Sequence, residues 1–240
     1  MPLEVRMLDD VRPDESAHEF LPGMSRGGLM PWYDLVARFR GLSRLYRRTV
    51  ELAQIGPGQH VLDVGCGTGN LSREVLRAAP EVVVTGLDPD GDSLRRAARK
   101  LRRRRRGEVT LVRGFAHRLP VPDASQDHVV SSLALHHVPA DEKERLAAEI
   151  VRVLRPGGSV TVADFAGDHA SRHGHENQRR HVEPGHRPGH GPGSRTHDAD
   201  NADGGIERLL TTAGLHDARA LGRMPLLGDS VVFVRARRLA

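Results

Sequence analysis

Three glycines at alternate positions, Gly65, Gly67 and Gly69, follow a short apolar segment and are well placed for ligand chemistry. Because glycine has no Cβ, such a turn can adopt backbone angles closed to other residues and lets a ligand approach the main chain. The spacing differs from a dinucleotide fingerprint and lacks the Gly-Lys-Ser/Thr of a phosphate-binding loop. Asp63, at the end of the predicted strand 60–64, would suit a cofactor with a cationic amine.

A second acid, Asp88, ends the next predicted strand, 82–87, about twenty residues after the glycine turn. In nucleotide-binding α/β units, an acid at this position accepts hydrogen bonds from ribose hydroxyls. The glycine turn and Asp88 together therefore predict a site for a cofactor that contains a nucleoside.

With these two segments, the chain resembles the class I S-adenosylmethionine-dependent methyltransferases, and among them the small-molecule branch that includes the ubiquinone and menaquinone biosynthesis enzymes. The resemblance continues, in family order, through residues 114–120 (GFAHRLP), 127–138 (DHVVSSLALHHV) and 154–159 (LRPGGS). It covers residues 31–165 strongly and 204–237 weakly. It implies S-adenosylmethionine as the cofactor, and methyl transfer to oxygen, nitrogen or carbon of a small-molecule acceptor.

The resemblance also implies further cofactor contacts. Where the family commonly has Gly-Asp-Ala, whose acid receives the adenine amino group, this chain has Phe115 before Ala116. Phe115 could pack on the ring but cannot accept that hydrogen bond, whereas the Ala116 amide can still serve. The remaining candidate contacts are Tyr33, Cys66, Pro89 and Ser131. Tyr33 could equally be a boundary aromatic, and Pro89 could equally be a turn residue.

Two adjacent histidines, His136 and His137, follow the fourth predicted strand of the core. Methyl transfer from a sulfonium is an in-line displacement, in which alignment alone can supply roughly 7–11 kcal/mol in favourable systems. A hydroxyl acceptor would also need a general base, and either histidine could provide it. The family's Leu-His-x-Val pattern favours His136. Alternatively, either ring could cap the following helix or hydrogen-bond a backbone carbonyl.

The same segment bears on the substrate class. Residues 132–135 (SLAL) lack the Asn/Asp-Pro-Pro-Tyr/Phe with which DNA and RNA amino-methyltransferases hold a flipped-out base. Ser132 also stands where metal-dependent catechol-type enzymes place an acid. We therefore expect no catalytic magnesium and assign no metal ligands.

Composition sets further bounds. With 240 residues, 38% of them hydrophobic, the chain can bury one sizeable core. It has no apolar run of about 18 residues, and its N-terminus lacks the apolar core of a signal peptide. The single cysteine, Cys66, excludes a disulfide framework and fits a reducing compartment. We therefore expect a cytoplasmic protein without a transmembrane segment, whose oligomeric state the sequence leaves open.

The net charge of +5 is concentrated between Arg95 and Arg106, where five arginines are consecutive. Such a run could bind RNA or an anionic membrane. We favour a solvated helix end, because no aromatic side chains interleave the arginines. This argues against nucleic acid as a partner. Two alternatives to a small-molecule enzyme stay open: an RNA-directed methyltransferase, and a cofactor-binding regulatory protein without efficient turnover.

Alternating strand and helix patterns predict an α/β fold, a Rossmann-like doubly wound sheet with ligands at the carboxyl ends of its strands. The predicted strands of the core are 60–64, 82–87, 109–113, 127–132 and 158–164. The predicted helices are 69–78, 91–103, a short one after 113, and 141–153, preceded by a helix pair from residue 31. Helix 204–213 and apolar stretches 215–221 and 230–236 would complete a seven-stranded, mostly parallel sheet with an antiparallel C-terminal hairpin.

The chain divides into four regions on this basis. Residues 1–29 show no sustained period and are predicted to be a flexible arm, and residues 30–165 form the methyltransferase core. Residues 166–203 contain seven histidines and many Gly, Pro and Arg, and cannot build a core. We interpret them as a disordered insert in place of the family's substrate lid, with metal binding as the alternative. Residues 204–240 complete the sheet.

Overall fold

Successive side chains of strand β2 (His60–Val64) pack into different parts of the core. Val61 belongs to an apolar cluster with Val75, whereas Leu62 belongs to another with Ile150. Because side chains alternate between the two faces of a strand, a strand buried in this way needs helices on both sides of its sheet. This confirms the predicted doubly wound arrangement.

The computed structural model describes residues 5–15, 32–79, 81–102, 107–167 and 198–240, with the backbone alone for 14, 32–40, 198 and 199. Its other strands are β1 (Val5–Asp9), β3 (Val83–Asp88), β4 (Glu108–Arg113), β5 (Gln126–Ser132), β6 (Leu154–Phe165), β7 (His216–Leu226) and β8 (Asp229–Arg237). Its α-helices are α1 (Trp32–Ala53), α2 (Asn70–Ala78), α3 (Gly91–Leu101), α4 (Ala140–Val153) and α6 (Gly205–Thr212). Short 3-10 turns are η1 (Pro13–Glu15), η2 (Leu135–His137) and η4 (Asp198–Gly204).

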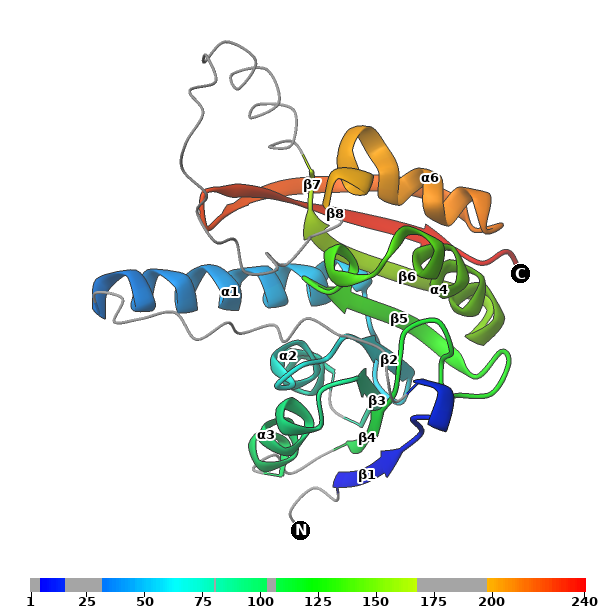
Figure 1. Cartoon of the computed structure of the whole chain (residues 1–240), viewed down its shortest axis with the longest axis horizontal. Helices are drawn as coiled ribbons and strands as arrows, with labels where there is room; N and C mark the ends of the chain where they lie inside the picture. Colours follow the sequence, from blue (N-terminus) through cyan, green and yellow to red (C-terminus); the bar gives the residue numbers. More distant parts are fainter. Residues whose placement is uncertain (1–4, 16–31, 80, 103–106, 168–197) are drawn as a thin grey trace, which may run out of the picture.

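The strands form one sheet in the order β1-β4-β3-β2-β5-β6-β8-β7 (Figure 1). All neighbours from β1 to β6 pair in parallel, and β8 runs antiparallel between β6 and β7. Helices α2 and α3 lie beside β2, β3 and β4, while α4 and α6 cover the other face (Figure 1). The mostly parallel sheet with an antiparallel C-terminal hairpin is thus confirmed.

The sheet has eight strands rather than the predicted seven, because residues 5–9 form an edge strand. β1 pairs in parallel with β4, from Val5 opposite Val109 to Asp9 opposite Arg113. Only Val5 of this strand is buried, so its sequence carries no apolar alternation, and backbone pairing holds it in place. The prediction of a flexible arm is therefore wrong for residues 5–15.

Two predicted helical features also differ. The helix pair before the core is one continuous helix of 22 residues, α1. Gly41 lies within it, where an added Cβ would come within 3.0 Å of Leu226, so this glycine allows close packing on the C-terminal hairpin. The short helix predicted after β4 is absent, since residues 114–125 form an irregular loop held by side chains of neighbouring elements.

Strands β2 and β5 are parallel neighbours, but the strands that follow them in the chain lie on opposite sides of the pair. From β2 the chain passes through α2 to β3, and from β5 through α4 to β6. Such a topological switch point leaves a crevice at the carboxyl ends of the two strands, where open α/β sheets bind ligands. Asp63, Asp88 and Ser132 all lie at this edge. Among the described residues, no helix combines the length and apolarity needed to span a membrane.

Candidate active site

The three glycines of the turn after β2 serve different purposes. At Gly65 (φ 71°) a Cβ would lie 2.3 Å from that of Ala134, so this glycine lets the turn pack on the loop after β5. At Gly69 (φ 72°) a Cβ would lie 3.0 Å from that of Ala97 in α3. At Gly67 (φ 50°) the nearest atom would be Oδ2 of Asp88, 4.0 Å away. Gly67 is therefore where the backbone leaves room for a ligand.

Asp88, the predicted ribose acceptor, lies against the glycine turn. The Gly67 amide donates to its Oδ2 at 2.7 Å, and the Asp90 amide donates to its Oδ1 at 2.9 Å. Burial raises the pKa of Asp88, and these two backbone hydrogen bonds oppose that shift. Each carboxylate oxygen can accept more than one hydrogen bond, so the group retains capacity for a ligand. Pro89 follows at the partly exposed edge of the crevice.

Asp63 is buried beneath the turn, with 1% of its surface exposed. The Ser72 hydroxyl of α2 donates to its Oδ2 at 2.5 Å, while its Oδ1 has no hydrogen-bond partner among the described residues. Burial raises the pKa of Asp63 to about 7, despite hydrogen bonds from Ser72, and the charge of Asp88 adds to the effect. A cation that donates a hydrogen bond to Oδ1 would give this oxygen a partner and would lower the raised pKa. The site is thus consistent with the predicted cationic amine.

Two candidate contacts turn away from the crevice. The Cys66 side chain is buried against Gly86, where a Cβ would come within 2.9 Å of its Sγ, and burial raises the pKa of its thiol. The Ser131 hydroxyl is buried and donates to the Val64 carbonyl at 2.9 Å. The structure therefore does not bring either side chain to the open side of the turn, and only their backbone could contact a ligand there.

Lys100 of α3 holds the far end of the glycine turn, a role that sequence reasoning missed. Its Nζ donates to the Thr68 carbonyl at 2.6 Å and to Oδ1 of Asn70 at 2.6 Å. Burial lowers the pKa of Lys100 to about 8, and the charge of Arg73 adds to this. Its neighbours Arg95, Arg96 and Arg99 of α3 and Arg102 just after the helix are exposed, and residues 103–106 lie outside the described residues. The RNA-binding and solvated-helix interpretations both stay predictions.

His136 forms a buried pair with Asp164, near the end of β6. Its Nδ1 lies 2.6 Å from Oδ1 of Asp164, and 6% of the His136 surface is exposed. The fully buried carboxylate also accepts hydrogen bonds from the Leu135 and Phe165 amides, at 2.8 and 2.7 Å. A carboxylate is an acceptor, so we assign the proton to Nδ1, which leaves Nε2 as the basic nitrogen. Nothing in the sequence linked these residues, 28 positions apart.

His137 lies beside His136, with ring centroids 4.0 Å apart. Burial lowers the pKa of His137 to about 4, with His136 contributing and Asp164 opposing, so it is neutral at pH 7. Its Nδ1 and the Ser132 hydroxyl are buried without hydrogen-bond partners in the described part of the chain. No side chain caps the start of α4, which excludes the helix-capping alternative for both histidines.

Phe115 and Ala116 follow strand β4, which pairs with β3 and so lies next to Asp88. The Gly114 amide donates to the Asp88 carbonyl at 3.3 Å, and both Phe115 and Ala116 are partly exposed. The Phe115 ring stacks on His117, with centroids 5.9 Å apart and planes 14° from parallel. The structure thus brings Gly67, Asp88 and the Phe115 loop to one edge of the sheet.

Two further predictions cannot be placed. Tyr33 lies in α1, but its side chain is outside the described residues, as is most of the histidine-rich segment, 168–197. The disordered-insert and metal-binding interpretations therefore stay predictions for residues 168–197. The predicted insert was wrong at its end, because residues 198–203 belong to η4 and the buried Asn201 donates to the Phe165 carbonyl at 3.0 Å. Elsewhere, the described residues contain no group of three or more His, Cys, Asp or Glu side chains placed to hold a metal ion.

Comparisons with known proteins agree with this geometry. Residues 61–158 match a family model described as a methyltransferase domain. The demethylmenaquinone methyltransferase of Renibacterium salmoninarum is 36% identical over 160 residues, which are 65% of this chain and 61% of that protein. The ubiquinone/menaquinone biosynthesis C-methyltransferase of Ectopseudomonas mendocina is 36% identical over 132 residues, or 52% and 50% of the two chains. The chain thus spans less than two thirds of the length of these relatives.

Solved structures share the fold. Magnesium protoporphyrin IX methyltransferase from Synechocystis PCC 6803, with bound SAH, gives a TM-score of 0.63 at 18% identity and covers 88% of this chain and 90% of that one. A SAM-dependent methyltransferase from Methanosarcina mazei gives 0.58 at 23% identity and covers 75% and 92%. At such identities the likeness concerns the fold alone.

Strands β3 to β5 and the glycine turn with its acid lie in the part of the chain, residues 61–158, that matches a methyltransferase domain model. Over these residues the chain is similar to methyltransferases that use S-adenosylmethionine. Within that class it resembles the branch of the ubiquinone and menaquinone biosynthesis methyltransferases.

Proposed function

We propose that this protein transfers a methyl group from S-adenosylmethionine to a small-molecule acceptor. The observation that carries the proposal is the contact between the Gly67 amide and Asp88, in a turn that leaves room for a ligand against its backbone. S-adenosylmethionine supplies an electrophilic methyl group on a positively charged sulfur. The unpartnered, buried oxygen of Asp63 also fits a cofactor that brings a cation.

Each part of the crevice has a role in this proposal. Asp88 accepts hydrogen bonds from the ribose hydroxyls, and Gly67 lets the cofactor lie against the backbone, while Gly65 and Gly69 keep the turn packed. The charge of Asp63 favours the cationic amine from below. The remaining contacts are Phe115 and Pro89 on the adenine, the Ala116 amide, the backbone of Cys66 and Ser131, and Tyr33 from α1.

His136 acts on the acceptor. With its Nδ1 held by Asp164, the ring presents Nε2 as the nitrogen that can accept a proton from an acceptor hydroxyl. Asp164 fixes the tautomer and stabilises the imidazolium that forms, as a buried carboxylate does when it orients a catalytic histidine. The neutral ring of His137 packs beside it and adds no competing positive charge at pH 7.

The names of relatives suggest the acceptor class. One is named a demethylmenaquinone methyltransferase and another a ubiquinone/menaquinone biosynthesis C-methyltransferase, and both names refer to quinones. We propose a small, partly apolar acceptor methylated at oxygen, nitrogen or carbon, and a cytoplasmic location, which the single cysteine supports. A metabolite screen with isotope-labelled cofactor tests this. Methylated product would exclude the regulatory alternative, and methylated RNA alone would favour the RNA-directed one.

The ribose assignment predicts a loss of cofactor affinity in Asp88→Ala. Removing the carboxylate should weaken S-adenosylhomocysteine binding about tenfold or more, because charge-assisted hydrogen bonds contribute about 1.5–3 kcal/mol. Gly67→Val should weaken binding at least as much, since it places a side chain where the ligand must approach. Titration calorimetry measures both, with Asp92→Ala, an exposed acid of α3, as the matched control. Wild-type affinity in Asp88→Ala would remove the ribose assignment.

A further inference from the structure

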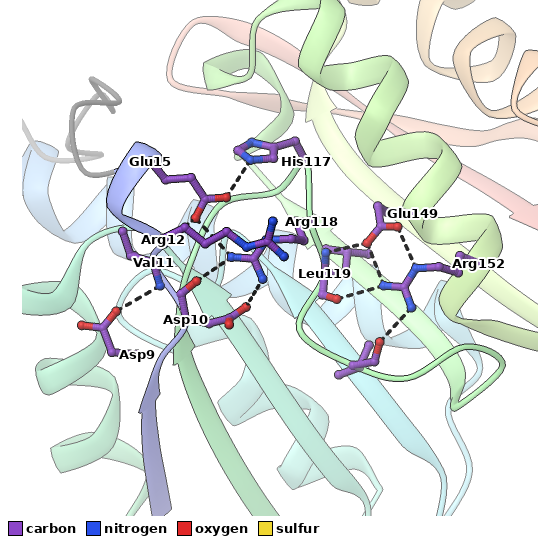
Figure 2. Close-up of polar contacts among 11 residues, drawn as sticks. Asp9, Asp10, Val11, Arg12, Glu15, His117, Arg118, Leu119, Glu149 and Arg152 are labelled. Atoms are coloured by element: carbon purple, nitrogen blue, oxygen red, sulfur yellow. Dashed lines mark hydrogen bonds and ion pairs between the residues drawn. The ribbon is translucent and has the colours of Figure 1, made fainter.

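The N-terminal segment formed by β1 and η1 (residues 5–15) forms hydrogen bonds and ion pairs with the loop that carries Phe115 (Figure 2). Arg118 of this loop donates to Oδ2 of Asp10 at 2.5 Å, to the Asp10 carbonyl at 2.6 Å and to Oε2 of Glu15 at 3.1 Å. These residues are more than 100 positions apart in sequence. The N-terminal segment is thus joined to the predicted adenine side of the crevice by charged hydrogen bonds as well as by β1–β4 pairing.

Glu15 is the buried centre of this contact. Only 4% of its surface is exposed, and its Oε1 lies 2.9 Å from Nε2 of His117 (Figure 2). Burial opposes its ionisation, but hydrogen bonds from the Arg12 amide, Arg118 and His117 outweigh this and lower the pKa of Glu15 to about 2. Glu15 is therefore ionised at neutral pH and holds one edge of the His117 ring. The face of that ring stacks on Phe115.

Leu119, the residue after Arg118 in the same loop, is held by α4. The Leu119 amide donates to Oε2 of Glu149 at 2.8 Å, and Arg152 donates to the Leu119 carbonyl at 2.9 Å (Figure 2). The three residues from His117 to Leu119, which follow Phe115, are therefore held by the N-terminal segment and by α4. The Phe115 ring itself stacks on His117.

We propose that Glu15 and His117 are positioning residues that hold the Phe115 ring as the platform for the adenine of the cofactor. This inference rests on the proposed function. Phe115 cannot accept a hydrogen bond from the adenine amino group, so its contribution is ring packing, which depends on the orientation of the ring. A ring held in place before binding loses less conformational entropy when the cofactor arrives. The N-terminal segment is then part of the cofactor site.

A double-mutant cycle between Glu15→Gln and Phe115→Ala tests this, with S-adenosylhomocysteine affinity measured by titration calorimetry. We expect Glu15→Gln to weaken binding about fivefold and Phe115→Ala about tenfold, and the double variant to bind no more weakly than Phe115→Ala, because one residue acts through the other. Thermal unfolding, measured in parallel, should show that Glu15→Gln lowers stability equally in both backgrounds. If Glu15 only stabilised the fold, Glu15→Gln would lower affinity as well as stability in both backgrounds.

Asp9→Asn is the matched control, because Asp9 belongs to the same segment but forms exposed contacts, an ion pair with Arg113 and a hydrogen bond from the Val11 amide, and it should bind like the wild type. His117→Gln removes the stack while leaving Glu15 in place, and should repeat the fivefold loss, again only when Phe115 is present. Additive losses in the double variants, or full affinity in both Glu15→Gln and His117→Gln, would overturn the inference while the wild type still binds. Failure of the wild-type protein to bind S-adenosylhomocysteine would instead overturn the proposed function.

Discussion

Replacing His136 with alanine should lower the methyl-transfer rate by about 100-fold or more while leaving cofactor affinity nearly unchanged. The reason is the buried pair with Asp164, which fixes the ring and directs the basic character to Nε2. Single-turnover kinetics with the acceptor found in the metabolite screen measure the rate, and calorimetry measures the affinity. The loss should be largest for a hydroxyl acceptor, because a neutral amine or an activated carbon acid needs a base much less.

Two further variants separate the roles around this ring. Asp164→Asn should also slow the reaction, since an amide favours the wrong tautomer of His136 and cannot stabilise its protonated form. His137→Ala should retain most of the rate. A full rate in His136→Ala with a large loss in His137→Ala would show that His137, and not His136, is the base. Full rates in both would mean that alignment alone carries the reaction.

The sequence predicted the elements whose signals are local. Strand β2 and the glycine turn could be identified because apolar runs and glycines report directly on burial and backbone conformation. Asp88 could be chosen as a candidate because it ends a buried strand, and the structure brings it to the glycine turn. β1 was missed because only Val5 of that strand is buried, and the pairing that holds it involves residues about 100 positions away.

The site residues that sequence reasoning missed have one property in common: their partners in the site are far away in the sequence. Asp164, Lys100 and Glu15 act through partners between 28 and 103 positions away. In isolation each is an ordinary charged residue of a strand, helix or turn. Conversely, the side chains of Cys66 and Ser131 turn away from the crevice, because direction within a turn or strand end depends on packing that a motif does not encode.

The cofactor-free protein should lose stability as the pH rises from about 4 to 8, because of Asp63. Burial raises the pKa of this carboxyl from 3.8 to about 7 in the folded state. A raised pKa means that the folded state binds the proton more tightly, so its stabilising effect is complete below 3.8 and is lost as the pH rises through 7. With 1.36 kcal/mol for each pH unit, the upper bound on the loss is about 4 kcal/mol. Urea unfolding at pH 5 and pH 8 measures it.

Asp63→Asn should remove most of this pH dependence and make the cofactor-free protein more stable at pH 8 than the wild type, since the amide never ionises. Asp92→Asn, which removes an exposed acid, should leave the dependence intact.

Asp63→Asn should also bind S-adenosylhomocysteine about tenfold more weakly, because it no longer offers a negative charge beneath the cationic amine. In the wild type near pH 7, binding should release protons from Asp63, so the calorimetric heat should change with the ionisation enthalpy of the buffer. Heat that is independent of buffer, with equal unfolding free energies at pH 5 and pH 8, would show that Asp63 is already ionised in the free protein and that its buried charge is compensated by another group.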